Sequence, residues 1–244
     1  MEKIVSLEKS DIQLALVEYR DHPPQDSTFV TRAHNFTESV REMKEWLEKA
    51  SAEGGGDQPE AVADGLNDAN NLSWRANATK ICVLIADAPP HGLMQSGDTF
   101  PNGCPKEIDP IKVITRMGEK GITLYCVGCE PALLPFKSYF AAMAHKTGGQ
   151  YVPLRNAKLL ADVIVGGARE EISLERLVGD AGKEVEELRR QGITDEKEIA
   201  ENLQRLLLNK GVTTNQLAMN NRNLEGASEK AINYSKMTNL CDIK

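Results

Sequence analysis

One stretch decides how the rest of the chain is interpreted: residues 80–92, which read K-I-C-V-L-I-A-D-A-P-P-H-G. The unbroken apolar run 81–86 has the length of a strand, and its lack of alternation is typical of a strand covered on both faces. Pro89 and Pro90 prevent further ladder pairing. Asp87 therefore lies at the carboxyl end of a buried strand, where open α/β sheets place their ligands. The alternative is a turn residue that accepts local amide protons.

The segments around this strand alternate between strand and helix patterns. Strands are expected at residues 12–19, 28–36, 122–127 and 150–154, and helices at 40–50, 59–72, 110–120, 136–147 and 157–165. Repeated strand–helix units predict an α/β fold, a doubly wound and mostly parallel sheet with helices on both faces. The first two strands would supply an antiparallel edge. Residues 1–10 have the pattern of the end of a helix.

The pattern changes beyond Gly167. We expect a sheet domain over residues 1–167, a C-terminal helical hairpin over 168–211 and a polar, loosely ordered tail over 212–244. Each helix of the hairpin carries one apolar stripe. These stripes need a partner, which is either the sheet domain or another chain, so self-association through the hairpin is one prediction.

Composition excludes several classes of function. The chain has 244 residues and a formal charge of −7, with 29 basic and 36 acidic residues and no basic run. This argues against binding to nucleic acid or to an anionic membrane surface. No apolar stretch reaches the roughly 18 residues of a membrane span, and no signal peptide begins at Met1. The odd number of cysteines, five, predicts free thiols and a cytoplasmic location.

Two carboxylates, Asp57 and Glu60, lie three residues apart across an expected helix start, directly after a run of three glycines. Glycines let the backbone bend closely, and a hard divalent cation prefers oxygen ligands from several loops. Asp57, Glu60, Asp87 and Asp21 would all lie at strand or loop ends on one rim. The alternative for Asp57 and Glu60 is that they only complement the dipole of the helix that follows.

Other metal-ligating side chains fit simpler interpretations. Cys126-x-x-Cys129 has the spacing of a redox or zinc pair, but without a second pair or a helix start nearby it favours free thiols. His91 and His22 could touch a ligand, although exposed loop histidines fit the pattern better.

Five segments together resemble a known family. They are Tyr19-Arg-Asp-His-Pro-Pro, Gly54-Gly-Gly-Asp-Gln-Pro-Glu-Ala-Val, Val83-Leu-Ile-Ala-Asp-Ala-Pro-Pro-His-Gly, Leu124-Tyr-Cys-Val-Gly-Cys-Glu-Pro and Thr147-Gly-Gly-Gln-Tyr-Val-Pro-Leu. In this order they resemble the von Willebrand factor type A (vWA) module over residues 2–177, most closely the intracellular kind found with alpha-type kinases. The resemblance implies a Rossmann-like fold with a metal-ion-dependent adhesion site (MIDAS). There Mg²⁺ or Mn²⁺ bridges to an acidic residue of a protein partner, without covalent chemistry.

The resemblance also assigns residues to that site. Asp87 matches the metal ligand at the end of the family's fourth strand, and Glu60 matches a ligand in the D-x-P-E form of integrin beta subunits. Asp57 and Asp21 match carboxylates that hold an adjacent Ca²⁺ in that form. The chain has Gly55–Gly56 where many members carry a coordinating Thr. The Asp-x-Ser/Thr-x-Ser motif of the first, central strand is not in the sequence, which predicts an N-terminally incomplete domain and a weakened metal site.

Two classes of function follow. The favoured one is a non-enzymatic protein-interaction module that binds through the rim loops. The alternative is a nucleotide-binding α/β enzyme or a regulatory fragment of an alpha-kinase-like protein. The enzyme would need a G-x-G-x-x-G turn after the first strand and a nucleophile or base pair, and the sequence shows neither.

Overall fold

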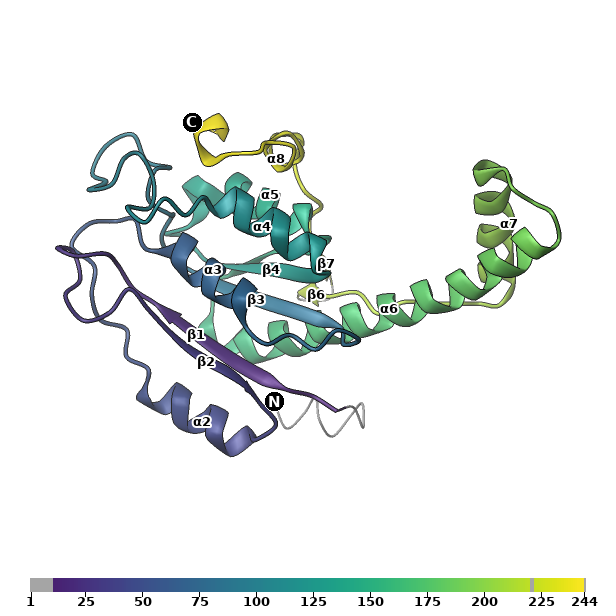
Figure 1. The fold of residues 1–244 in the computed structure, drawn as a ribbon, viewed down its shortest axis with the longest axis horizontal. Helices are drawn as coiled ribbons and strands as arrows, with labels where there is room; N and C mark the ends of the chain where they lie inside the picture. Colours follow the sequence, from purple (N-terminus) through teal and green to yellow (C-terminus); the bar gives the residue numbers. More distant parts are fainter. Residues whose placement is uncertain (1–10, 220–221, 244) are drawn as a thin grey trace. The chain divides into compact units, whose positions relative to one another are not determined.

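The structure is a computed structural model that describes residues 11–219 and 222–243. The chain divides into two compact units, one of Met1–Asp162 with Leu224–Lys244 and one of Val163–Asn223. Figure 1 shows the chain coloured along its sequence. The expected helix end at residues 1–10 lies outside the described residues.

A parallel sheet forms the centre of the first unit (Figure 1). Its strands are β3 (Lys80–Ala86), β4 (Ile122–Cys129) and β5 (Tyr151–Leu154), in that order. Lys80 pairs with Ile122, and the register continues to the ends of both strands. The helices that flank the sheet are α3 (Val62–Asn71), α4 (Pro110–Glu119) and α5 (Lys137–Lys146), with the short turns η1 (Leu134–Phe136) and η2 (Ala157–Leu159). The predicted α/β fold class is confirmed.

The first two strands form a separate sheet. β1 (Leu14–Tyr19) pairs with β2 (Thr31–Thr37) in antiparallel register, and α2 (Val40–Lys49) follows. Among the described residues no strand pairs both β1 and β3, so these two strands lie in different sheets. The hydroxyl of Tyr19 donates to the Ile85 carbonyl at 3.1 Å and links their carboxyl ends. The antiparallel pair that the sequence predicts therefore exists, but as a sheet of its own rather than as an edge of the parallel sheet.

Apolar side chains of the sheet and its helices form the core. β4 is buried along most of its length, and fully buried residues of α4 and α5, such as Ile114 and Phe140, pack against it. Asp109 caps α4 by accepting hydrogen bonds from the Ile111 and Lys112 amides, and Pro110 occupies the first turn, as the sequence predicts.

The segment before α3 differs from the prediction. The helix begins at Val62 rather than at Pro59, because the backbone of Glu60 forms a parallel bridge to Pro90. The Glu60 amide donates to the Pro89 carbonyl at 2.9 Å. The Ala61 amide donates to the Arg20 carbonyl at 2.8 Å. Residues 60–61 thus connect the loop after β1 to the loop after β3.

The C-terminal segment of the first unit is more ordered than expected. Residues 212–244 are predicted to form a loose tail, but α8 (Glu229–Ser235) packs against α5, and the short helix η3 (Leu240–Ile243) follows. Leu240 and Ile243 are buried in the core of the sheet domain. The segment is short and mostly polar, with weak periodicity, which is why the sequence pattern does not reveal its helices.

One long helix, α6 (Leu160–Arg190), forms where two helices are predicted, and all but its first three residues belong to the second unit. The expected boundary at Gly167 lies inside it. Glycine in a helix interior costs about 1 kcal/mol relative to alanine, so a glycine pair need not end a helix. A Cβ at Gly166 would lie 2.4 Å from Cδ1 of Leu217, so the small residue permits close packing there.

The remaining elements of this unit are α7 (Glu196–Asn209), β6 (Ala218–Met219) and β7 (Arg222–Asn223). Asp195 caps α7 by accepting a hydrogen bond from the Glu198 amide. Lys210 forms an ion pair with Glu184 of α6 at 2.5 Å.

The helices of the second unit expose some of their apolar residues, with Val178 68% and Leu208 72% exposed. Self-association through this unit stays a prediction, and light scattering of a chain ended near Val178 tests it. No helix in the described part of the chain combines the length and the apolarity needed to cross a membrane.

Candidate functional site

The four acids singled out in the sequence lie in loops that meet at the carboxyl ends of β1 and β3. Asp21 follows β1, Asp87 follows β3, and Asp57 and Glu60 lie in the loop that leads into α3. The backbone bridge between Glu60 and Pro90 joins these loops. We call Asp21, Asp57, Glu60 and Asp87 the acidic rim.

The glycine run lets this loop come close to its neighbours. Gly54 and Gly55 both have positive φ, at 107° and 88°. A Cβ on Gly55 would lie 2.9 Å from Oε1 of Glu60, and one on Gly54 would lie 2.0 Å from Oδ2 of Asp26. Side chains at these positions would therefore displace the carboxylates, which supports the role that the sequence assigns to the glycines.

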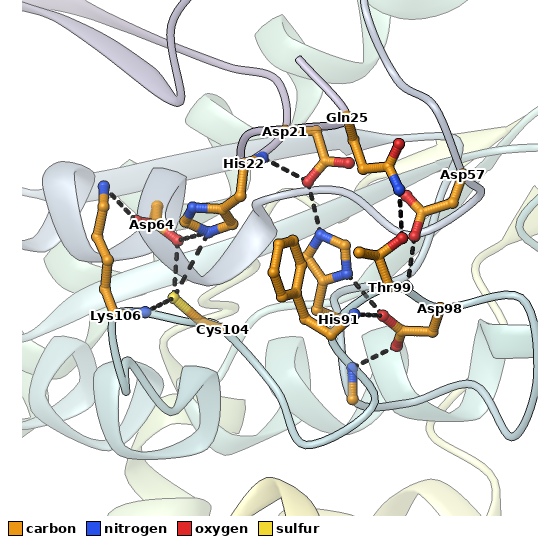
Figure 2. Close-up of polar contacts among 12 residues, drawn as sticks. Asp21, His22, Gln25, Asp57, Asp64, His91, Asp98, Thr99, Cys104 and Lys106 are labelled. Atoms are coloured by element: carbon orange, nitrogen blue, oxygen red, sulfur yellow. Dashed lines mark hydrogen bonds and ion pairs between the residues drawn. The ribbon is translucent and has the colours of Figure 1, made fainter. Parts of the chain in front are cut away.

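Asp21 is fully buried, and its two oxygens differ in their surroundings. Oδ1 accepts hydrogen bonds from the His22 amide and from Nε2 of His91, each at 2.6 Å (Figure 2). Oδ2 is buried without a hydrogen-bond partner. A buried carboxylate oxygen without a hydrogen-bond partner is costly, so Oδ2 of Asp21 is available to a cation or a donor.

His91 lies between two carboxylates. Its Nδ1 is 2.8 Å from Oδ1 of Asp98, whose Oδ2 accepts from the Gly92 amide at 2.7 Å (Figure 2). Burial opposes protonation, but the hydrogen bonds to Asp21 and Asp98 outweigh it and raise the pKa of His91. Both ring nitrogens of His91 thus lie within hydrogen-bond distance of a carboxylate, and burial raises the pKa of its partner Asp21 as well. The expectation of an exposed loop histidine is wrong, because His91 is only 3% exposed.

Asp57 is held by the long loop that follows β3. Its Oδ2 accepts from the Thr99 amide at 2.7 Å, while its Oδ1 is buried without a partner. Gln25 donates to the Thr99 hydroxyl (Figure 2). Three potential metal-ligand atoms lie within 4.8 Å of one another here, one each from Asp21, Asp57 and His91.

The pKa of Glu60 reports the negative charge of the acidic rim. Burial, followed by the negative charges of Asp21 and Asp87, raises the pKa of Glu60 to about 7. His91 opposes this rise without cancelling it. Asp87 itself is exposed. The structure thus brings the four acids within electrostatic reach of one another, and their negative charge is only partly compensated.

A second polar cluster lies beside the rim. His22 Nε2 is 2.9 Å from Oδ2 of Asp64, and the Cys104 thiol donates to the same oxygen at 3.1 Å (Figure 2). Lys106 forms an ion pair with Oδ1 of Asp64 at 2.9 Å. Burial and then the hydrogen bond to Asp64 raise the pKa of Cys104 to about 11. The expectation of an exposed His22 is also wrong, since the residue is 3% exposed.

Sequence reasoning missed Asp98, Asp64 and Cys104. Asp64 had a usable signal, because residues 61–66 are otherwise small or apolar, so a helix there is buried on most sides and its acid needs a partner. Asp98 and Cys104 lie in a loop without periodicity, and only their contacts identify them.

The Cys126-x-x-Cys129 pair lies on β4. Cys126 is fully buried in the core, and burial raises its pKa well above the ordinary value. Such a residue behaves as a small apolar side chain rather than as a reactive thiol.

A parallel sheet flanked by helices, with acids gathered in the loops at its carboxyl edge, defines an α/β domain with a candidate cation site. The model of the family described as "Mediator complex subunit 25 von Willebrand factor type A" matches residues 2–140, more than half of the 244 residues. The chain therefore belongs to the von Willebrand factor type A family, as its motifs predict. Domains of this type are generally protein-interaction modules.

Three curated proteins share similarity with parts of the chain. The alpha-protein kinase vwkA of Dictyostelium discoideum is 30% identical over 117 residues, which is 47% of this chain and 18% of the kinase. The putative ariadne-like RING finger protein R811 of Acanthamoeba polyphaga mimivirus is 26% identical over 62% of this chain and 15% of its own length. The benzoate 4-monooxygenase bphA of Aspergillus niger is 27% identical over 71% of this chain and 34% of its own length. The chain thus spans about a third or less of each relative.

Proposed function

We propose that this chain is a non-enzymatic protein-interaction module that binds an acidic residue of a partner protein through the acidic rim. A divalent cation held by the rim would connect the two. The observation that carries this proposal is the pair of buried carboxylate oxygens without partners, Oδ2 of Asp21 and Oδ1 of Asp57. The exposed carboxylate of Asp87, whose charge raises the pKa of Glu60, is accessible to a partner.

The residues present fit a hard divalent cation. Asp21, Asp57, Glu60 and Asp87 offer only oxygen atoms, which Mg²⁺, Mn²⁺ and Ca²⁺ prefer. The raised pKa of Glu60 reports negative charge that a cation would neutralise. Glu60 and Asp87 would hold Mg²⁺ or Mn²⁺, and Asp57 and Asp21 would hold an adjacent Ca²⁺. The bound ion would supply positive charge toward a partner carboxylate.

The rim lacks the hydroxyl ligands of the Asp-x-Ser/Thr-x-Ser motif, and Gly55 stands in the loop where other members carry threonine. Mg²⁺ requires near-octahedral geometry and gives up its waters reluctantly. We therefore expect Mn²⁺ and Ca²⁺, which accept less regular ligand sets, to bind more tightly than Mg²⁺.

The three relatives support a role without catalysis. Their names describe a kinase, a RING finger protein and a monooxygenase, and each is similar to this chain over only part of its length. A region shared by proteins of such different chemistry is better explained by recognition than by a common reaction.

A manganese titration tests the cation site. Mn²⁺ bound to the full chain should enhance water-proton relaxation, and Glu60→Gln should weaken binding, because it removes one charged ligand. Glu186→Gln, which changes an exposed acid of α6, is the matched control and should leave binding unchanged. Equal binding by the wild type and Glu60→Gln would contradict the proposal.

Acetate tests the recognition of a carboxylate. With Mn²⁺ bound, acetate should displace exchangeable water from the ion and lower the relaxation enhancement, whereas acetamide should not. A thermal-shift scan with nucleotides tests the alternative function, a nucleotide-binding enzyme. Stabilisation by a nucleotide without any response to cations would favour an enzyme instead.

A further inference from the structure

We propose that His22, Asp64 and Cys104 form a zinc-binding site that is separate from the acidic rim. The three residues come from different parts of the fold: His22 from the loop after β1, Asp64 from the first turn of α3, and Cys104 from the long loop before α4. They offer one nitrogen, one oxygen and one sulfur atom, all within 4.8 Å of one another. Figure 2 shows these side chains pointing toward a common centre.

The distances between these atoms are close to those around a bound zinc ion. His22 Nε2 is 2.9 Å from Asp64 Oδ2 and 3.6 Å from Cys104 Sγ, and the sulfur is 3.1 Å from that oxygen. Ordinary Zn–N, Zn–O and Zn–S bond lengths at tetrahedral angles place such ligands about 3.3–3.6 Å apart. Shifts of about half an ångström would therefore admit the ion.

The ligand set selects zinc over the cations expected at the rim. Thiolate and imidazole are soft or borderline ligands that favour zinc, whereas Mg²⁺ and Ca²⁺ prefer oxygen atoms alone. The site is also protected from water, because Asp64 is 2%, His22 3% and Cys104 9% exposed. If an ion replaced the hydrogen bonds between these residues, water would weaken its attraction to the ligands only a little.

Outer contacts hold two of the three ligands in place. Lys106 binds the second oxygen of Asp64 at 2.9 Å, which orients the carboxylate. The Lys106 amide donates to the Cys104 sulfur at 3.3 Å, and the Ile108 amide also donates to it. Amide donors directed at a sulfur stabilise its thiolate form, and such outer partners typically fix the geometry of metal ligands.

Charge balance favours a doubly charged ion. Zinc binding replaces the Cys104 proton, so the ion meets one thiolate and one carboxylate whose charges cancel its own. The His22 ring adds no negative charge. The positive charge of Lys106 remains at the partly exposed edge of the cluster.

A cavity gives access and room for a fourth ligand. Cys104 lines a cavity of about 550 Å³ together with Phe100, Gly103 and Asn239. Three protein ligands leave one position of a tetrahedral zinc ion open, and a water molecule from this cavity would fill it.

The first test uses the unaltered full chain. After dialysis against Zn²⁺ under reducing conditions and removal of loosely held metal, the protein should retain one equivalent of zinc. Bound zinc should slow alkylation of Cys104, located by peptide mass spectrometry, but not that of Cys129, which lies outside the cluster. Retention of less than one equivalent, or equal alkylation of Cys104 with and without zinc, would overturn the proposal.

The second test uses variants and cobalt as a spectroscopic substitute. Co²⁺ should give a tetrahedral spectrum with a thiolate charge-transfer band. Cys104→Ser should abolish that band and weaken zinc binding by more than about a hundredfold, since even the loss of an outer partner typically costs about 10–100-fold. Cys129→Ser, the control that also tests the Cys126-x-x-Cys129 pair, should retain both.

Loss of zinc in Cys129→Ser but not in Cys104→Ser would place the metal at the other cysteine pair and overturn the proposal. Circular dichroism checks that each variant is folded. If Cys104→Ser does not fold, the alkylation experiment on the wild type decides.

Discussion

Two neighbouring clusters of this domain differ in how far the negative charges of their carboxylates are compensated. In the His22–Asp64–Cys104 cluster, each side chain is hydrogen-bonded within the cluster, and Lys106 forms an ion pair with Oδ1 of Asp64, although that oxygen accepts no hydrogen bond. In the acidic rim, by contrast, Asp21 and Asp57 each keep a buried oxygen without a partner. The carboxylate of one cluster is paired with a lysine, whereas the negative charge of the other is only partly compensated, by His91.

The contrast is notable because the two clusters begin at consecutive residues. Asp21 belongs to the rim and His22 to the other cluster, yet the His22 amide donates to Asp21. The rings of His22 and His91 lie 5.9 Å apart, and Phe100 contacts both edge-on. A short segment can thus serve two sites with different ligand chemistry, one made of oxygen atoms and one of mixed atoms.

The largest effect is expected for Asp21→Asn. Removing one partner of the buried Asp21–His91 pair leaves His91 with only Asp98, and the loss of one member of a buried pair typically costs about 3–5 kcal/mol. Urea denaturation should show a fall of this size in the free energy of unfolding. Asp180→Asn, at an exposed helix position, should change it by less than about 0.5 kcal/mol. A similar small change for Asp21→Asn would show that the His91–Asp21 pair does not stabilise the fold.

The next effect concerns pH and Glu60. A carboxyl whose pKa is raised from 4.5 to about 7 binds its proton more tightly in the folded chain, so stability is lost as the pH rises through this window. The loss should reach about 2–3 kcal/mol after allowance for partial exposure.

The free energy of unfolding should be measured between about pH 5 and about pH 8, because this range spans the Glu60 pKa of about 7. Glu60→Gln should show a shallower fall than the wild type, and the difference between the two isolates Glu60 from His91, whose raised pKa acts in the same direction. Saturating Mn²⁺ should also flatten the wild-type curve. Parallel curves for the two proteins would contradict the charge repulsion described for the rim.

A smaller effect is expected for Gly55→Ala. The new Cβ would meet Glu60 at 2.9 Å, in addition to the strain of a positive φ, and should destabilise the fold by about 1–2 kcal/mol. Gly97→Ala is the matched control, because Gly97 also has positive φ but nothing within 4 Å of a Cβ. Manganese binding should weaken only in Gly55→Ala, and zinc binding should be unchanged in both. Equal manganese affinity in the two variants would show that the approach of Gly55 to Glu60 does not shape the rim.

The smallest effect is coupling between the two clusters. Zinc bound by His22, Asp64 and Cys104 adds net positive charge beside the rim, so it should weaken Mn²⁺ binding by a few fold. Titrations of the wild type with Mn²⁺, with and without saturating zinc, measure this change. Cys104→Ser should show no dependence on zinc. Tighter manganese binding in the presence of zinc would contradict a purely electrostatic coupling.

The sequence predicts the parts of this molecule that have a regular pattern. The apolar run at 81–86 and the Asp109 cap lead to the parallel sheet and to α4, and the glycines before Asp57 lead to the rim loop. The sequence also places Asp87 correctly at the end of a strand. These features depend on local spacing, which a single chain shows directly.

What the sequence does not reveal depends on contacts between distant segments. The burial of His91 follows from Asp21, 70 residues away, and the role of Cys104 follows from Asp64, 40 residues away. The continuous α6 depends on packing that tolerates Gly166, and the ordered C-terminal segment depends on a few buried residues, such as Leu240, in an otherwise polar stretch. No local pattern encodes these contacts, because periodicity and capping report only on neighbouring residues.

The central claim is that two adjacent clusters bind different metal ions because they offer different ligand atoms. Its most direct test is dialysis of the full chain against zinc and manganese together, followed by metal analysis of the wild type, Cys104→Ser and Glu60→Gln. We predict that Cys104→Ser loses zinc alone and that Glu60→Gln loses manganese alone. Loss of both metals in one folded variant, or of neither in both, would contradict the claim.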